Sequence, residues 1–100
     1  MLLVEQNISL ENVIHELGYV DLVSFANQQA QDVLWKKIKH CEENIKAFEL
    51  KYMMTYSEFE ENFQAITTIK VFEKEDDGMM WETEMSLRNH YLAMIKTIVE

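Results

Sequence analysis

The fold of this chain is decided by residues 22–52, which read LVSFANQQAQDVLWKKIKHCEENIKAFELKY. Apolar side chains recur in this stretch at steps of three or four residues, which is the spacing of one face of an α-helix. The members of this apolar stripe are Ala26, Ala30, Leu34, Ile38, Cys41, Ile45, Phe48 and Tyr52. No Gly or Pro interrupts the stretch, and we therefore predict one long helix.

The length of the predicted helix bears on how the protein assembles. A helix of about 32 residues is roughly 48 Å long at about 1.5 Å per residue. A compact 100-residue domain is only about 35 Å across, from its expected radius of gyration. We therefore expect the helix either to kink or to have its ends covered by a second copy of the chain or by a different protein.

The composition predicts a single helical domain over residues 1–100. Hydrophobic residues make up 48% of the chain, Pro is absent, and Gly occurs only at Gly18 and Gly78, as is typical of a helix-rich protein. The chain carries 18 acidic and 9 basic residues, for a formal net charge of −9. This sign disfavours direct binding to nucleic acid and favours docking onto a basic partner.

Cys41 and residues 1–5 indicate the cellular compartment of the protein. A lone cysteine has no partner for an internal disulfide, and its place on the apolar stripe predicts a buried thiol in a reducing cytoplasm. The start, Met1-Leu2-Leu3-Val4-Glu5, is too short and becomes acidic too early to read as a signal peptide. No apolar run is long enough to span a membrane. We expect a cytoplasmic protein without membrane contact.

Two shorter helices are predicted around the long one. Ser9 can cap a helix over residues 10–17, with Val13, Ile14 and Leu17 inward and with Gly18 at its end. Asp21 can cap the long helix. A break is expected near Met53-Met54, and Thr55-Tyr56-Ser57-Glu58 then reads as a capping box. The short helix that this box opens carries Phe59 and Phe63 at a spacing of four residues.

The last predicted helix runs from about Asp77 to Val99, where Asp76 and Asp77 suit a helix N-terminus. Its apolar stripe comprises Trp81, Met85, Leu92, Ile95 and Val99. Arg88 interrupts this stripe, and we expect its charge to pair with Glu84 one turn away. Residues 66–72 are the hardest to assign, because their Ile, Thr and Val content leaves open a hairpin with residues 79–85 through Asp77-Gly78.

The predicted fold class is therefore all-α, a three- or four-helix bundle built around one long central helix and forming a dimer. The seam of this core or dimer is expected to comprise Leu34, Ile38, Cys41, Ile45 and Phe48.

The sequence contains no motif that is typical of catalysis or of metal binding. His15, His40 and His90 are scattered, and the Glu-x-x-His motif of helical di-iron proteins is absent. No glycine-rich elbow surrounds a serine, and no glycine-rich loop is present to hold a phosphate. We predict a protein that is not an enzyme and that uses no metal and no cofactor.

The acidic residues are concentrated in one segment. From Ser57 to Glu84 nine acids stand against two lysines, for a net charge of −7. Large hydrophobic residues are interleaved with them, namely Phe59, Phe63, Phe72, Met79, Met80 and Trp81. Such a mixture suits a docking surface for a basic partner with an apolar cleft. The alternative is that the aromatic residues fill the core and the acids form a solvated face.

Two stretches carry a resemblance to a known family. Residues 52–60 read YMMTYSEFE and residues 72–82 read FEKEDDGMMWE. Over residues 34–96 this order resembles small helical proteins of bacteria and archaea that are encoded beside toxin genes of toxin–antitoxin systems. The first thirty residues have no counterpart in that family, and Ile66-Thr67-Thr68-Ile69 stands where its members have a longer Glu-Gly linker.

The resemblance implies an antitoxin-like protein that neutralises a small basic toxin, often a nuclease-like one. Acidic side chains would occlude the surface of the toxin that otherwise holds substrate phosphate. The residues that it implicates, as anchors, as their support or as charge-matching groups, are Phe59, Phe63, Glu73, Asp76, Asp77, Trp81 and Glu82. Met80, one of the interleaved hydrophobic residues, is expected to join them in the partner-binding surface. The competing interpretation is a homo-oligomeric helical scaffold protein with no toxin partner.

Overall fold

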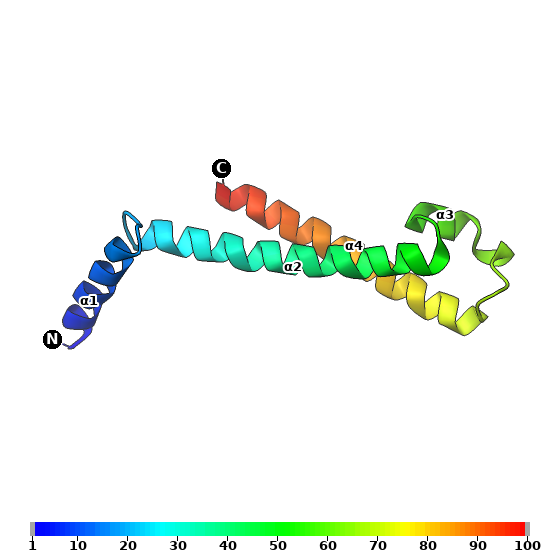
Figure 1. The fold of residues 1–100 in the computed structure, drawn as a ribbon, viewed down its shortest axis with the longest axis horizontal. Helices are drawn as coiled ribbons and strands as arrows, with labels where there is room; N and C mark the ends of the chain where they lie inside the picture. The colour runs from blue at the N-terminus through cyan, green and yellow to red at the C-terminus, as the bar shows by residue number, and fades with distance from the viewer. Residues whose placement is uncertain (1, 100) are drawn as a thin grey trace. The chain divides into compact units, whose positions relative to one another are not determined.

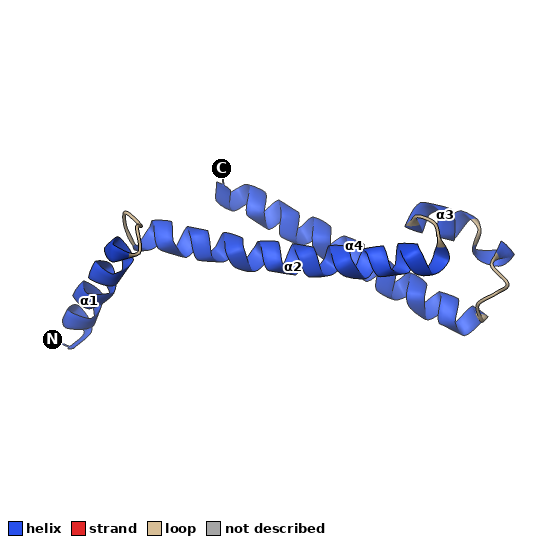
Figure 2. Cartoon of the chain, viewed as in Figure 1, coloured by secondary structure: helices blue, strands red, loops and turns tan. Residues whose placement is uncertain are grey.

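A computed structural model of the chain describes residues 2–99, and it describes the side chains of residues 9–98. Its elements are α1 (Leu2–Glu16), α2 (Leu22–Tyr52), α3 (Tyr56–Glu61), the 3₁₀ helix η1 (Phe63–Ala65) and α4 (Val71–Val99) (Figures 1 and 2). Within residues 2–99 there is no strand. The all-α class and the long central helix are thus confirmed. The hairpin alternative is wrong, because residues 79–85 lie inside α4.

The contacts divide the chain into two units, Met1–Val33 and Leu34–Glu100, and α2 contributes residues to both. The sequence predicted a single domain over residues 1–100, and this remains a prediction. Within residues 2–99, no helix combines the length and the apolar character needed to cross a membrane.

In the first unit, α1 is longer than expected. It begins at Leu2, so Ser9 lies inside the helix and does not cap it. No Gly or Pro stands before Ser9, and nothing local therefore stops the helix from extending. Its C-terminus follows the prediction: Gly18 has φ +96°, and its N–H donates to the His15 carbonyl. This left-handed conformation is the one that glycine adopts most readily at a helix end.

Fewer residues of α1 are buried than the sequence predicted. Ile14 is buried, whereas Val13 and Leu17 are exposed. The cap of α2 agrees with the prediction, because the Ser24 backbone N–H donates to Asp21 Oδ1 at 2.8 Å. This hydrogen bond holds the pKa of Asp21 below its ordinary value, and it satisfies one of the free N–H groups of the first turn.

In the second unit, α2 and α4 pack in antiparallel directions through two apolar clusters. One cluster joins Ile45 and Tyr52 of α2 to Trp81 of α4. The other joins Leu34 and Ile38 of α2 to Ile95 of α4. As residue numbers fall along α2 they rise along α4, and the two helices therefore run in opposite directions.

The residues predicted to form a core or dimer seam are thus placed within one chain. Leu34, Ile38, Cys41 and Ile45 are buried, and Phe48 is half-buried against the Trp81 cluster. Their side chains already pack against α4 in a single copy.

A polar layer separates the two clusters. Cys41 is buried there, and Glu84 and Arg88 of α4 are half-buried beside it. Burial first, and then the neighbouring Glu84 carboxylate, raises the pKa of the Cys41 thiol. The expected ion pair between Arg88 and Glu84 does not form: among residues 9–98, ion pairs join Lys51 to Glu73 and to Asp77.

The segment between α2 and α4 is a chain of short turns. α2 ends at Tyr52, where the break was predicted, and Met53 adopts φ +56°. The capping box is confirmed: Thr55 Oγ1 accepts from the Glu58 N–H, and the Glu58 carboxylate accepts from the Thr55 N–H. Phe63 lies beyond the end of α3, in η1.

α4 begins at Val71, six residues before the predicted start at Asp77. Asp76 and Asp77 therefore lie inside the helix and do not cap it. Asp77 instead accepts hydrogen bonds from the side chains of Lys51 and Tyr52. These tertiary contacts, together with the packing of Trp81, outweigh the local preference of aspartate for a helix N-terminus.

Candidate protein-binding groove

An aromatic cluster at the end of α2 lies beneath the candidate site. The Trp81 side chain is 0% exposed and stacks on Phe48 and Tyr52, with ring centroids 5.6 and 5.9 Å away. Phe59 is 2% exposed, and its centroid lies 5.2 Å from that of Trp81. Phe59 and Trp81 were expected as anchors or as their support. Both side chains are buried in this conformation, so neither is exposed for contact with another protein.

A glycine allows α3 to lie close against α4. A Cβ atom built on Gly78 would lie 3.1 Å from Phe59 Cε1, tighter than most real Cβ contacts. Gly78 is therefore a packing residue inside α4, whereas the sequence left open its use in a hairpin turn. The close approach places the Phe59 ring directly over the helix, and α3 becomes one wall of a groove.

Lys74 fixes the second wall. Its side chain rises from α4, and the residue is only 3% exposed. The ammonium group donates to the carbonyls of Phe63 and Ile66, each at 2.7 Å, and lies 4.3 Å from the centroid of the Phe63 ring. These carbonyls belong to η1 and to the residue after it, and Lys74 therefore ties this turn to α4.

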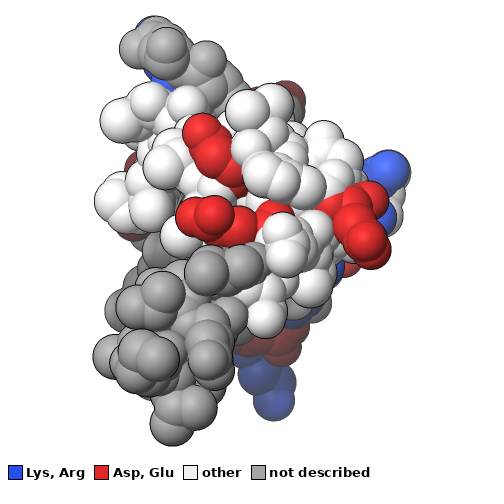
Figure 3. All heavy atoms as spheres, turned by 90° about the vertical axis from the view of Figure 1, so that its left-hand side faces the viewer, with Lys and Arg blue, Asp and Glu red and all other residues white. Residues whose placement is uncertain are grey.

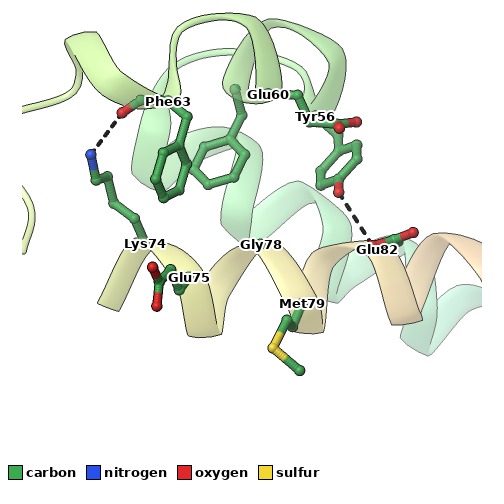
Figure 4. A pocket seen from close by; sticks show the side chains of 9 residues that line it. Tyr56, Glu60, Phe63, Lys74, Glu75, Gly78, Met79 and Glu82 are labelled. Atoms are coloured by element: carbon green, nitrogen blue, oxygen red, sulfur yellow. Dashed lines mark hydrogen bonds between the residues drawn. The ribbon is translucent and has the colours of Figure 1, made fainter. Parts of the chain in front are cut away.

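Between these walls lies an open groove of about 440 Å³, which we name the acidic groove. Its lining comprises Tyr56, Phe59, Glu60, Phe63, Lys74, Glu75, Gly78, Met79 and Glu82. Figure 4 shows Tyr56, Glu60 and Phe63 on the α3–η1 side, facing Lys74, Glu75 and Glu82 on α4. The groove therefore combines an aromatic lining with three carboxylates.

The electrostatics of the acidic groove favour a cation. Burial raises the pKa of the Tyr56 hydroxyl, and the charges of Glu60 and Glu82 raise it further. The Tyr56 hydroxyl also lies within 3.5 Å of Glu82 Oε2, to which it donates. Among the lining residues the basic side chain is that of Lys74. Its ammonium group already donates to the main-chain carbonyls of Phe63 and Ile66. The three carboxylates therefore keep a net negative charge to offer a ligand.

The structure brings together only part of the predicted partner-binding set. Phe63 and Glu82 line the acidic groove. Glu73 and Asp77 lie on the α2-facing side of α4, at 2.5 and 2.6 Å from Lys51 Nζ. Asp76 and Met80 are exposed and do not line the acidic groove.

The network around Lys51 is a structural one. Tyr52 donates to Asp77 Oδ2 at 2.6 Å, next to the Lys51 ammonium. Hydrogen bonds from Lys51 to Asp77 and Glu73 raise the pKa of the lysine. Burial, followed by the hydrogen bond to Asp77, raises the pKa of Tyr52. Two acids expected to meet a partner are thus used to join α2 to α4.

Sequence reasoning missed Glu60, Glu75, Met79 and Lys74 as members of one site. Glu75 and Met79 are one turn apart on α4, a spacing that places them on one helix face. Their meeting with Glu60 depends on the angle at which α3 folds back, which no local pattern encodes. Lys74 gave no sequence signal, because a buried lysine cannot be told from an exposed one by its neighbours.

Acidic side chains also occur elsewhere on the surface. On the face drawn in Figure 3, Asp and Glu stand singly among uncharged residues, with basic side chains toward the edges. The acidic groove is distinguished from these side chains by its hollow shape and its aromatic lining. Among the described residues, no group of three or more His, Cys, Asp or Glu side chains is placed to hold a metal ion.

Comparisons of the chain with family models, with curated proteins and with solved structures find no match.

Proposed function

We propose that this chain is a non-enzymatic protein-binding protein that takes a basic segment of a small partner into its acidic groove. The observation that supports this proposal is that Glu60, Glu75 and Glu82 line one groove together with the aromatic residues Tyr56, Phe59 and Phe63. A lysine or arginine side chain suits such a groove, since its apolar stem packs on aromatic rings while its charged end meets carboxylates.

The biological role that we propose is antitoxin-like. A small basic toxin that acts on nucleic acid must hold phosphate groups with cationic side chains. Carboxylates seated on those cations would occupy the same positions and occlude the active surface. Because Cys41 is a free, buried thiol, we place this activity in the reducing cytoplasm.

The test is capture of the tagged protein from its own host, washed at low and at high salt, with bound proteins identified by mass spectrometry. A stoichiometric small basic protein that salt releases is the expected result, since charge-driven docking weakens as salt rises. Recovery of the chain alone would contradict the proposal.

A matched pair of variants makes the test specific to the acidic groove. Glu60→Gln/Glu75→Gln/Glu82→Gln removes three charges from the lining, and we expect the captured partner to bind about tenfold to a hundredfold more weakly. Glu11→Gln/Glu42→Gln/Glu43→Gln removes three exposed charges outside it and is expected to bind as the unaltered protein does. Equal losses in both variants would show that net charge, and not the groove, carries the binding.

The second candidate is a homo-oligomeric scaffold with no toxin partner. Its support is the amount of large apolar surface left uncovered in one copy, which includes Phe72, Met79 and Met80. This role predicts self-association that persists at high salt, because apolar contacts are not screened.

A further inference from the structure

A second depression follows the seam between α2 and α4, and we name it the seam groove. It consists of three adjoining hollows of about 270, 170 and 210 Å³, each lined in part by Glu84. Other lining residues are Asn44 and Phe48 of α2 and Met80, Leu87 and Tyr91 of α4. Met79 borders both depressions, but none of these six residues lines the acidic groove, so substitutions among the six leave the lining of the acidic groove unchanged.

The α4 side of the seam groove is an uncovered apolar strip. Met80, Leu87, Tyr91 and Met94 follow one another at steps of seven, four and three residues, which places them along one side of the helix. Met80 is 58% exposed, and Met94 is also exposed. Glu84 is the one charged residue on this side between Met80 and Leu87. Grouped apolar residues mark an interaction surface more often than scattered ones do, and methionine adapts its shape to a facing surface.

The centre of the strip holds a polar group that one copy does not satisfy. Glu84 is half-buried, and its Oε2 atom is buried without a hydrogen-bond partner. Beside it, the Asn44 amide makes only a long contact of 3.4 Å with His40. The Cys41 thiol lies beside the same carboxylate, but a buried Oε2 atom without a donor of its own is unfavourable. The Asn44 amide of a facing copy, which lines the same hollow as Glu84, would supply that donor.

The charges at the two ends of the strip are opposite. Lys36 and Lys37 line the hollow next to Tyr91. Asp76 is exposed at the other end, eight residues before Glu84 and four before Met80. Because α2 and α4 are antiparallel, Lys37 and Asp76 lie about 10 to 12 Å from the centre in opposite directions, at about 1.5 Å per residue. Reversing one copy of this face would therefore bring each basic end over an acidic end.

We propose that the seam groove binds the same face of a second copy of this chain, with the two strips antiparallel about a twofold axis near Glu84. Such an isologous contact repeats every interaction twice. The Met80 side chains pack into the apolar strip of the opposite copy. The end of each copy that carries Lys37 lies over the end of the other that carries Asp76. This interface differs from the seam expected from the sequence. Leu34, Ile38 and Ile45 of that seam are buried inside the chain, whereas Cys41 and Phe48 also line the seam groove.

The first test is sedimentation equilibrium of the full chain over a wide range of concentrations. The unaltered protein is expected to dimerise, and Met80→Glu is expected to raise the dimer dissociation constant at least about tenfold. Leu50→Glu is the matched control, because Leu50 is 62% exposed and lines none of the hollows of either groove. A monomer at every concentration, or a Met80→Glu dimer as tight as the unaltered one, would overturn the proposal.

The second test reverses the charges at the ends. Lys37→Glu and Asp76→Lys alone are each expected to weaken the dimer about threefold to tenfold at low salt. Lys37→Glu/Asp76→Lys is expected to restore it, since the ends are again opposite in charge. A double variant that stays as weak as the single ones would overturn the antiparallel arrangement. Far-UV circular dichroism shows that each variant is helical, and partner binding at the acidic groove is measured separately on the same samples.

Discussion

The ammonium group of Lys74 donates a 2.7 Å hydrogen bond to the main-chain carbonyl of Phe63 and lies 4.3 Å from the centroid of its ring. A lysine that is only 3% exposed thus joins α4 to the turn that follows α3. This contact holds one wall of the acidic groove, and the first prediction concerns its removal.

Lys74→Met keeps an unbranched side chain that is one atom shorter, and it removes the charge and both hydrogen bonds. The carbonyls of Phe63 and Ile66 then lose their donor, which makes the folded state less favourable. We expect the free energy of unfolding to fall by about 2–4 kcal/mol, because hydrogen bonds from charged groups contribute about 1.5–3 kcal/mol each and the added methyl group offsets part of the loss. Urea denaturation measures the difference.

Lys70→Met is the control for this change, since Lys70 is exposed. Its substitution is expected to alter the free energy of unfolding by less than about 0.5 kcal/mol. Equal effects of the two substitutions would show that Lys74 contributes no more than a surface lysine.

The backbone conformation of Met53 offers a substitution that should raise the free energy of unfolding. Met53 has φ +56°, and its side chain is 81% exposed, so a left-handed backbone is held without compensating burial. Met53→Gly removes the unfavourable contact of Cβ with the backbone. We expect the free energy of unfolding to rise by about 0.5–1 kcal/mol, measured by thermal or urea denaturation.

The matched control uses the same residue type in a helical conformation. Met79 is exposed inside α4, and Met79→Gly is expected to lower the free energy of unfolding by about 1 kcal/mol. If both substitutions destabilise the protein, the left-handed conformation at Met53 is not the source of the effect.

The two tryptophans of the chain differ in burial, and we expect them to differ in how much each contributes to the free energy of unfolding. Trp81 is 0% exposed and Trp35 is 50% exposed. Trp81→Ala opens a cavity in the aromatic cluster, and we expect it to cost about 3–5 kcal/mol. Trp35→Ala is expected to cost less than about 1 kcal/mol. Urea denaturation followed by circular dichroism gives both values, and comparable losses would contradict the assigned core.

Trp81→Phe refines the same measurement. The Trp81 Nε1 atom is buried without a hydrogen-bond partner, and phenylalanine removes this unsatisfied donor while keeping most of the ring. We therefore expect Trp81→Phe to cost clearly less than Trp81→Ala.

The fold was predictable wherever local chemistry and helical spacing decide it. The bounds of α2 follow from its uninterrupted apolar stripe and from Asp21, and the turn after it follows from the Thr55–Glu58 capping box. The start of α4 was not predictable in this way. Asp77 has the local chemistry of a cap, but its partners Lys51 and Tyr52 are more than 20 residues away in the sequence.

In the candidate site, too, local spacing predicts some features and long-range packing decides the others. Spacing on α4 groups Glu75 with Met79 and Glu82, because residues three, four and seven apart share a helix face. Spacing also places Trp81 on the apolar stripe of this helix, in agreement with its burial. Spacing does not reveal that Glu60 approaches from α3, because this depends on where α3 packs, which is set by contacts such as that of Phe59 with Gly78.

The final prediction concerns stability at high pH. The pKa of Tyr52 is raised above its ordinary value of 10.0, first by burial and then by its hydrogen bond to Asp77. The folded protein therefore keeps the Tyr52 proton above about pH 10, where the unfolded chain loses it. Because the folded state then binds more protons, the stabilisation that is present below pH 10 is lost as the pH rises.

A comparison with Tyr52→Phe isolates this effect, since Lys51, whose pKa is also raised, is present in both proteins. Below pH 9 we expect the variant to be less stable by a constant amount, about 1 kcal/mol for the lost hydrogen bond. Above about pH 10 the unaltered protein should lose stability more steeply than the variant, by up to about 1.4 kcal/mol per pH unit, the value for one proton. Urea denaturation at a series of pH values gives the two slopes. Parallel slopes would mean that Tyr52 ionises alike in the folded and unfolded chains, and that its contact with Asp77 does not hold the hydroxyl proton.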